Sequence, residues 1–211
     1  MTLALYSYFR SSAAFRVRIA LELKGLEYRI IPVNLLAGEQ RGAAYMERNP
    51  QGFVPALELP DGSLLTQSPA IIEWLDATQP GPRLLPVDEL ARARIRAICG
   101  IVACDIHPLN NLRVLQYLEH ELTLDKDTRN SWYHHWLGEG FAALEPLLPE
   151  QGYCTGEAPG MAEAFIVPQV ANAQRFRFAM ERFPRTAALF ERCMALEPFM
   201  RAHPESQPDR N

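Results

Sequence analysis

Short apolar runs and one amphipathic stretch alternate at the start of the chain. Residues 3–8 form a short β-prone run, and residues 27–33 form a second one. Between them, the stretch 13–24 carries apolar residues at helical spacing, with two serines before it and Gly25 after it. Hydroxyls before such a stretch and a glycine after it are typical of the two ends of a helix. This order predicts a βαβ unit with two parallel strands.

A hairpin pattern and another helix pattern follow. The apolar runs 54–59 and 63–66 flank a Pro-Asp-Gly segment. Asp-Gly between two apolar runs indicates a β-hairpin. The polar stretch 35–49, rich in small residues, predicts an irregular helix, and Ser68 and Pro69 are expected at the N-cap and first position of the next helix. The predicted order β-α-β-(α)-β-β-α is that of a thioredoxin-like domain.

After this α/β region, strand signals largely stop. The segment 79–88 is rich in proline and is interpreted as a linker. We expect the domains to be 1–78 (thioredoxin-like), the linker 79–88, and an all-helical domain 89–211. The predicted helices of the second domain are 90–122, interrupted at Pro108, then 128–148, 161–180 and 184–196. The polar tail 204–211 contains two prolines and is expected to fray.

Composition excludes several classes of protein. The chain is 48% apolar and 22% charged, as in ordinary soluble globular proteins. It has no run of eighteen apolar residues and no secretory leader pattern, so we expect neither a membrane span nor export. The net charge of −4 argues against a nucleic-acid partner. Four cysteines form no C-x-x-C pair, and no zinc spacing is present, which predicts reduced thiols, a cytoplasmic location and no metal site.

Two serines are the first candidates for chemistry. Ser11 and Ser12 follow a predicted parallel strand and open a helix, where free N–H groups and the helix dipole favour an anion. A hydroxyl at that position can donate a hydrogen bond to a thiolate and keep it ionised near neutral pH. On the residues alone, both serines could instead be simple helix caps.

The segment beginning at Ser11 reads Ser-Ser-Ala-Ala-Phe-Arg-Val-Arg-Ile-Ala-Leu. It resembles the signature Ser-Ser-Cys-x-Trp-Arg-Val-Arg-Ile-Ala-Leu of the zeta-class glutathione transferases, which include maleylacetoacetate and maleylpyruvate isomerases. The resemblance covers nearly the full chain and departs at Ala13, where many members have Cys, and at Phe15, where the signature has Trp. Further matching segments are Asn49-Pro50, Val54-Pro55, Gln67-Ser68, Ala70 to Glu73, Pro108-Leu109, Asn111-Leu112, Val167 to Val170, Asn172-Ala173 and Arg175-Phe176.

The resemblance implies the glutathione transferase fold, glutathione as cofactor and a homodimer. It implies that Ser11 and Ser12 stabilise the thiolate, and that Arg175 completes the catalytic set. A cis Val54–Pro55 bond is also implied, so that the backbone of Val54 pairs with the cysteinyl part of glutathione. The full set of implied cofactor-binding residues is Ser11, Ser12, Phe15, Arg16, Gln40, Val54, Gln67, Ser68, His107, Asn111 and Arg113.

Family substrates are acids with a cis double bond conjugated to a carbonyl group, and they need cationic partners. Arg10, Arg113 and Arg175 are the implied substrate-binding residues, because an arginine can hold a carboxylate with two hydrogen bonds. In the family these stretches of the helical domain face the thiolate site. The implied reaction is addition of the glutathione thiolate, rotation about the resulting single bond, and elimination to the trans alkene.

The expected activity is therefore isomerisation of maleylacetoacetate in tyrosine and phenylalanine breakdown. Three alternatives stay open: isomerisation of maleylpyruvate in gentisate breakdown, general conjugation of glutathione to electrophiles, and a non-catalytic binding module of the same fold. A thiol–disulfide oxidoreductase is nearly excluded, because no cysteine occurs at positions 11–16.

Overall fold

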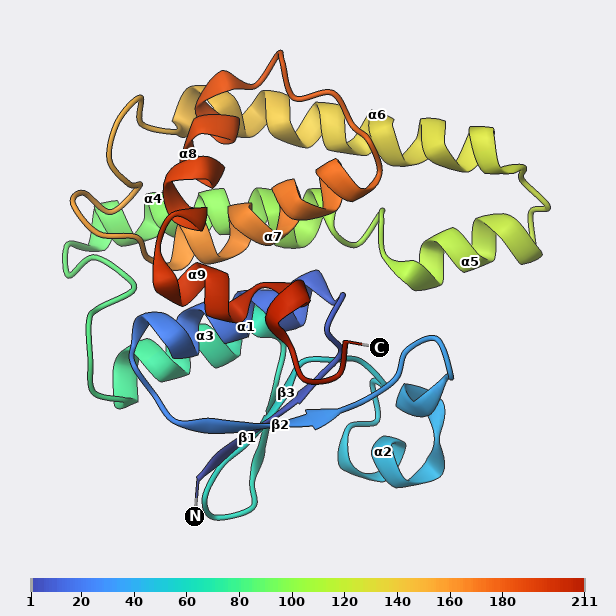
Figure 1. The fold of residues 1–211 in the computed structure, drawn as a ribbon, viewed down its shortest axis with the longest axis horizontal. Helices are drawn as coiled ribbons and strands as arrows, with labels where there is room; N and C mark the ends of the chain where they lie inside the picture. The colour runs from blue at the N-terminus through green and yellow to red at the C-terminus, as the bar shows by residue number, and fades with distance from the viewer. Residues whose placement is uncertain (1, 211) are drawn as a thin grey trace. The chain divides into compact units, whose positions relative to one another are not determined.

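The computed structural model describes residues 2–210 (Figure 1). The chain divides into two compact units, residues 2–85 together with 194–210, and residues 86–193. This division differs from the sequence-based domains at the C-terminus, because the last segment groups with the N-terminal unit and not with the helical one. A linker was expected at 79–88, and the boundary between the units lies after Leu85.

The N-terminal unit is built on a four-stranded mixed sheet with the strand order β2-β1-β3-β4. Strand β1 pairs in parallel with β2 and antiparallel with β3, and β3 pairs antiparallel with β4. These pairings confirm the predicted βαβ unit and hairpin. The elements of this unit are β1 (Leu3–Ser7), α1 (Ser12–Leu23), β2 (Tyr28–Pro32), a 3₁₀ turn (Glu39–Arg41), α2 (Ala43–Arg48), β3 (Ala56–Glu58), β4 (Leu64–Thr66), α3 (Ser68–Thr78), α9 (Glu197–Ala202) and a 3₁₀ turn (Pro204–Ser206).

Helix α1 begins and ends as the sequence predicts. Ser11 is the N-cap, and its Oγ accepts a hydrogen bond from the backbone N–H of Ala14 at 3.2 Å. At the other end, Gly25 has a φ of 64°, a left-handed conformation that glycine adopts without strain. The N–H of Leu26 then bonds back to the carbonyl of Leu21 at 3.0 Å, which closes the helix.

The core of this unit lies between the sheet and its helices. Leu5 and Leu57 of the sheet, with Ile19 of α1 and Ile71 of α3, are all 0% exposed. Each such side chain stabilises the fold by about 1.5–3 kcal/mol relative to an exposed one. In Figure 1, α1, α3 and α9 lie on one side of the sheet, and α1 contacts both α3 and α9.

The start of α3 corrects one prediction. Ser68 was expected to be the N-cap, but it is the first helical residue, and Gln67 occupies the cap position. Gln67 has a φ of 68° and a ψ of 114°, so the chain turns sharply between β4 and α3. A positive φ on a residue with a side chain is uncommon and is concentrated at functional sites.

The C-terminal tail corrects another prediction, because residues 204–210 are docked and not frayed. Gln207 is 8% exposed, and its Nε2 donates to the carbonyls of Arg201 at 2.8 Å and His203 at 3.0 Å. Asp209 accepts a hydrogen bond from the backbone N–H of Phe9, 200 positions earlier in the chain. Residue 211 lies outside the described residues.

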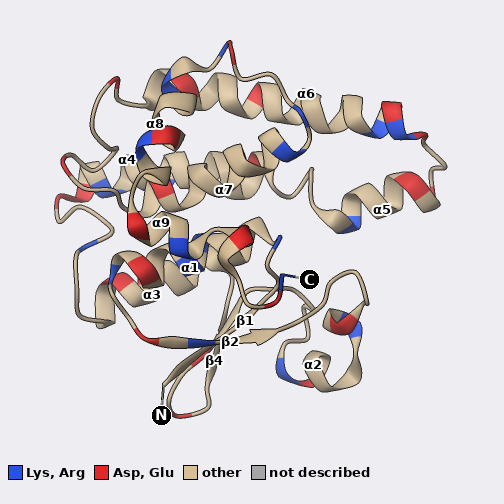
Figure 2. Ribbon diagram, viewed as in Figure 1, with Lys and Arg blue, Asp and Glu red and all other residues tan. Residues whose placement is uncertain are grey.

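The second unit is helical. Its elements are α4 (Glu89–Gly100), a π-helical segment (Ile101–Ile106), α5 (Leu112–His120), α6 (Lys126–Leu144), a 3₁₀ turn (Glu145–Leu147), α7 (Met161–Arg175) and α8 (Pro184–Met194). The interruption predicted at Pro108 is confirmed, since Pro108 lies between the π-helical segment and α5. Figure 2 shows acidic and basic residues interspersed along the helices of both units.

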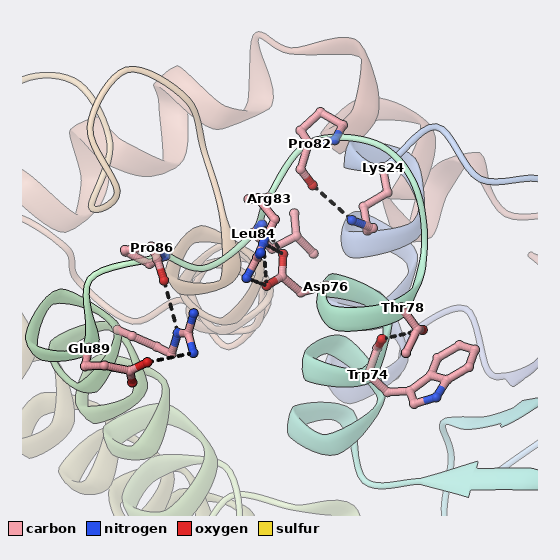
Figure 3. A network of polar contacts seen from close by, with 10 residues as sticks. Lys24, Trp74, Asp76, Thr78, Pro82, Arg83, Leu84, Pro86 and Glu89 are labelled. Carbon is pink, nitrogen blue, oxygen red and sulfur yellow. Dashed lines mark hydrogen bonds and ion pairs between the residues drawn. The ribbon is translucent and has the colours of Figure 1, made fainter.

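The first part of the linker is fastened to the N-terminal unit (Figure 3). Asp76 of α3 is 5% exposed, and its carboxylate accepts from the N–H of Leu84 at 2.6 Å and pairs with Arg83 at 3.0 Å. Lys24, at the end of α1, donates to the carbonyl of Pro82 at 3.0 Å. These bonds hold residues 82–84 against α1 and α3.

None of the helices within residues 2–210 combines the length and the apolar character that a membrane crossing needs.

We predict that Gly140→Ala destabilises the helical unit. A Cβ at position 140 would lie 2.1 Å from Cγ1 of Ile106, a residue that is 0% exposed at the end of the π-helical segment. Overpacking of this kind costs about 1–3 kcal/mol, measurable as a lower urea midpoint. Gly138→Ala is the matched control on the same helix, because its nearest neighbour would be 3.9 Å away. Equal midpoints for the two variants would contradict this close packing.

Candidate functional site

Ser11 lies where the loop after β1 turns into α1. Its Oγ accepts from Ala14 N–H, and its own N–H donates to the carbonyl of Tyr8 at 2.9 Å. A hydroxyl that accepts through its oxygen still carries a proton that it can donate. Ser12 occupies the first helical position and is 6% exposed. The half-buried Ser11 hydroxyl therefore adds a donor beside the backbone N–H groups of the first turn of α1.

Arg16 joins the starts of two helices. It is 2% exposed, and its Nη1 donates to Oγ of Ser68 at 3.3 Å. Ser68 is itself 4% exposed and is the first residue of α3. Through this bond the structure brings together the α1 and α3 positions that the sequence placed in one site.

Gln67 presents its side chain to solvent beside the start of α3. Its Nε2 donates to Oε1 of Gln51 at 2.6 Å, while its carbonyl accepts from the N–H of Ile71 at 3.0 Å. The left-handed backbone at Gln67 thus both caps the helix and projects an amide next to it. A glutamine amide can donate and accept at once, which suits an amino-acid ligand.

The segment before β3 is held by two residues whose role the sequence analysis did not assign. The Val54–Pro55 bond is cis, as the resemblance implied. Tyr45 Oη at 2.6 Å and Asn49 Nδ2 at 2.8 Å both donate to the carbonyl of Phe53, immediately before Val54. Asn49 is 3% exposed, and burial raises the pKa of Tyr45, so its hydroxyl remains a donor. The Asn49-Pro50 match was the only sequence signal for this support.

Gln40 lies in the 3₁₀ turn next to this segment. Its side chain is half-buried, and its Oε1 is buried without a partner among the described residues. Gly52 packs against the same turn with a φ of 62°, and a Cβ there would lie 2.9 Å from the carbonyl oxygen of Gln40. Close backbone contact therefore fixes Gln40 relative to the chain that leads into Val54.

Two predicted site residues of this unit lie in different surroundings. Phe15 is 1% exposed and packs edge-on against His203, with ring centroids 5.8 Å apart. Its side chain is a core element and has no surface for a ligand. Arg10 is exposed, and its guanidinium carbon lies 4.9 Å from the centroid of the Phe9 ring. This stacking places the Arg10 cation on the loop formed by residues 8–11, here called the serine loop.

In the helical unit, three predicted residues gather at the start of α5. Asn111 is the N-cap, and its Oδ1 accepts from the N–H of Arg113 at 3.1 Å. Nδ2 of Asn111 lies 3.5 Å from Nε2 of His107. Arg113 is exposed and His107 half-buried. The break at Pro108 therefore places an imidazole, an amide and a guanidinium side by side in the chain.

Arg175 ends α7 and is supported by aromatic rings. Its guanidinium carbon lies 5.1 Å from the centroid of the Phe176 ring, which stacks on Tyr133 of α6 at 3.9 Å and 16°. Burial raises the pKa of Tyr133, and the nearby charge of Arg175 partly offsets that rise. Arg175 is exposed, so the stack presents a cation to solvent.

The same turn of α6 also holds the segment around Pro108. The carbonyl of Tyr133 accepts from Nδ2 of Asn110 at 3.1 Å, and Nε1 of Trp132 donates to the carbonyl of Leu109 at 2.9 Å. Trp132 and Tyr133 were not identified from the sequence, since aromatic residues on a helix usually indicate only core packing. They link the His107–Asn111 region to Arg175 within one unit.

The four cysteines all lie in the helical unit. Cys104 is exposed in the π-helical segment, whereas Cys99 and Cys193 are buried. Burial, reinforced by the nearby Glu163, raises the pKa of Cys154 and keeps it a thiol. The N-terminal unit therefore offers donors for a thiolate but carries no cysteine of its own.

Residues 10–78, from the loop before α1 to the end of α3, match the family model described as the glutathione S-transferase N-terminal domain. A maleylacetoacetate isomerase of Pseudomonas aeruginosa is 48% identical over 207 residues, with 97% of each chain covered. The chain belongs to the zeta class of glutathione transferases, the family of maleylacetoacetate and maleylpyruvate isomerases.

Solved structures agree. A maleylpyruvate isomerase described as a bacterial zeta-class glutathione transferase superposes with a TM-score of 0.95 at 43% identity, covering 99% of this chain and 100% of the other. A maleylacetoacetate isomerase of Anaeromyxobacter dehalogenans has a TM-score of 0.89 at 42% identity, covering 100% of this chain and 94% of the other. That protein was solved with dicarboxyethyl glutathione and citrate in its active site.

Proposed function

We propose that this protein is a glutathione-dependent cis–trans isomerase that converts maleylacetoacetate to fumarylacetoacetate in tyrosine and phenylalanine breakdown. The observation that carries the proposal is the Ser11 hydroxyl, which caps α1 through its oxygen and keeps its proton for an anion. The 48% identity to the isomerase of Pseudomonas aeruginosa over 97% of each chain supports the choice of substrate.

The residues of the N-terminal unit fit glutathione. The buried, unpartnered Oε1 of Gln40 is an acceptor for an N–H group of a ligand. Gln67 and Ser68 at the start of α3 suit a carboxylate, and the backbone of Val54 suits the cysteinyl peptide groups. When bound, glutathione supplies a thiolate that adds to the substrate double bond and leaves after rotation, so it is not consumed.

Ser11 and the first turn of α1 have the central role. The Ser11 hydroxyl donates to the sulfur, and the N–H groups of Ser12 and its neighbours add positive potential, so the thiol ionises near neutral pH. These donors are already fixed by the cap and by the turn to Tyr8. Donors that need no reorganisation stabilise charge effectively, which is how the chain would accelerate both addition and elimination.

The helical unit supplies the cations for an acidic substrate. We assign Arg175 to one carboxylate, because its guanidinium is exposed and is held by the Phe176 ring. Arg113, with His107 and Asn111, and Arg10 of the other unit are further candidates for the keto and carboxylate groups. The dicarboxyethyl glutathione in the Anaeromyxobacter protein is what addition of this thiol to a butenedioic acid gives, which supports the addition step.

The activity assay separates this proposal from its alternatives. Purified protein should isomerise maleylacetoacetate only when glutathione is present, with slower turnover of maleylpyruvate and little conjugation of a chloroaromatic. Faster turnover of maleylpyruvate would favour gentisate breakdown, and dominant conjugation would favour a general transferase. Isomerisation at an equal rate without glutathione would refute the mechanism, and failure to bind glutathione would indicate a non-catalytic module.

We predict that Ser11→Ala lowers kcat/KM for isomerisation by roughly 100-fold, the size of effect seen when one donor to a developing anion is removed. The bound thiol should also ionise at higher pH, visible in thiolate absorbance. Loss of the cap should cost about 1 kcal/mol in stability. Ser11→Thr, which keeps a hydroxyl and a capping oxygen, is the matched control and should retain most activity. Full turnover of Ser11→Ala would exclude this role.

A second prediction concerns Arg175. Arg175→Gln should raise KM for the acidic substrate and lower kcat/KM by roughly 10- to 100-fold, since a hydrogen bond to a charged group contributes about 1.5–3 kcal/mol. Affinity for glutathione should stay within twofold. Arg177→Gln is the control, because Arg177 is exposed two positions later. Equal kinetics for the two variants would remove Arg175 from the substrate site.

We further propose a cytoplasmic homodimer. The support is the membership of the zeta class and the thiol character of the buried cysteines, which suits a reducing compartment. Light scattering should give a native mass twice the 23.9 kDa of the chain. A monomer at micromolar concentration would contradict the dimer.

A further inference from the structure

The backbone of Phe9 is held on both sides by charged side chains. Its N–H donates to Oδ2 of Asp209 at 2.9 Å, and its carbonyl accepts from Nη2 of Arg18 at 3.1 Å. Phe9 is 5% exposed and lies two residues before Ser11. A buried backbone N–H needs a partner, and here the partner comes from the far end of the chain.

Arg18 connects this loop to two other segments. It is 0% exposed, its Nε donates to the carbonyl of Ala202 at 2.9 Å, and its Nη1 donates to Oγ of Ser7 at 3.0 Å. Burial lowers its pKa to about 10, which leaves it charged at neutral pH. One guanidinium therefore joins the end of β1, the serine loop and the end of α9.

The segment that delivers Asp209 is itself fixed. Gln207 donates to the carbonyls of Arg201 and His203, and the His203 ring packs against Phe15 of α1. The same tail also carries an ion pair between Arg210 and Glu205 at 2.5 Å, whose two side chains are exposed, so it contributes little to this anchoring. In Figure 1 the red C-terminal segment follows α9 alongside α1, consistent with these bonds.

We propose that Asp209 is a positioning residue for the isomerase, which aims the Ser11 hydroxyl by anchoring Phe9 from the C-terminal tail. The turn between Tyr8 and Ser11 is closed by a bond from the Ser11 N–H to the Tyr8 carbonyl at 2.9 Å. Phe9 lies inside this turn, so its two anchors determine how the turn enters α1. The inference rests on the proposed function of Ser11. It extends the site to Asp209, near the other end of the chain.

Removal of the Asp209 carboxylate leaves the Phe9 N–H without an acceptor. The turn then relaxes to find one, and the Ser11 hydroxyl loses its fixed direction toward the sulfur. Gln67 and Ser68, which are proposed to bind the γ-glutamyl end, make no bond to the tail in the described residues. Thiolate stabilisation should therefore weaken while affinity for glutathione changes little.

The test compares three variants in the full chain. Asp209→Ala removes the acceptor, and Asp209→Asn keeps an acceptor oxygen without the charge. Glu205→Ala is the matched control, since it removes a carboxylate from the same tail that bonds to Arg210 and not to the loop. For each, kcat, KM, glutathione affinity and the pKa of the bound thiol by thiolate absorbance are measured below the melting transition.

Asp209→Ala should lower kcat by about tenfold, which corresponds to about 1.4 kcal/mol, and shift the thiol titration to higher pH. Glutathione affinity should stay within roughly twofold. Asp209→Asn should recover most of the loss, and Glu205→Ala should match the wild type. If Asp209→Ala shows the same thiol titration and the same kcat as Glu205→Ala, the inference is overturned. It is also overturned if the loss of kcat is fully accounted for by a smaller fraction of folded protein.

The thiol titration needs no substrate, so it separates this inference from the proposed activity. If the wild type binds glutathione but isomerises neither acid, the proposed isomerase fails, and a titration shifted in Asp209→Ala still supports anchoring of the serine. If both the activity and the wild-type thiolate are present but Asp209→Ala titrates unshifted, the anchor fails alone. A wild type that does not ionise glutathione overturns both.

Discussion

The arrangement of the N-terminal unit depends on the buried guanidinium of Arg18. Arg18 is fully removed from solvent, and a charge in that position is very unfavourable unless it is hydrogen-bonded. Its acceptors come from the end of β1, from the loop that precedes Ser11 and from the end of α9. Because all three must be in place together, the guanidinium ties the geometry of the serine loop to the docking of the last helix. The fold and the proposed thiolate site therefore share one interaction.

Elements governed by local rules could be predicted from the sequence. A capping hydroxyl and a terminal glycine gave the limits of α1 to within a residue, and Asp61-Gly62 located the hairpin. The start of α3 was misplaced because Ser68 is the stronger capping residue by preference. The chain needs a left-handed turn there, which Gln67 adopts against its intrinsic tendency. Site candidates such as Ser11 came from the family signature. The position of Ser11 before a helix could not by itself distinguish a helix-capping residue from a hydrogen-bond donor to a thiolate.

Interactions between distant segments left no local pattern. The tail was expected to fray because it is short, polar and rich in proline, and composition carries no information about an acceptor for Phe9 at the other end of the chain. The stacking of Tyr133 on Phe176 could not be predicted for a similar reason, since an aromatic residue in a helix pattern usually indicates only core packing. What the sequence missed is therefore the support of the candidate residues: Asp209 behind Ser11, and Tyr133 behind Arg175.

The replacement of the family cysteine by Ala13 fits this arrangement of support. The proposed reaction needs one sulfur nucleophile, which glutathione brings, and a protein thiol beside an electrophilic alkene would compete for it. The N-terminal unit has no cysteine, while burial raises the pKa of both Cys154 and Cys193 in the helical unit and keeps them unreactive. In this proposal, chemical selectivity comes from the donors at the start of α1, which favour the thiolate of bound glutathione. In the proposed site, the hydrogen bonds at the start of α1 would ionise a bound thiol, and position 13 carries no thiol of its own.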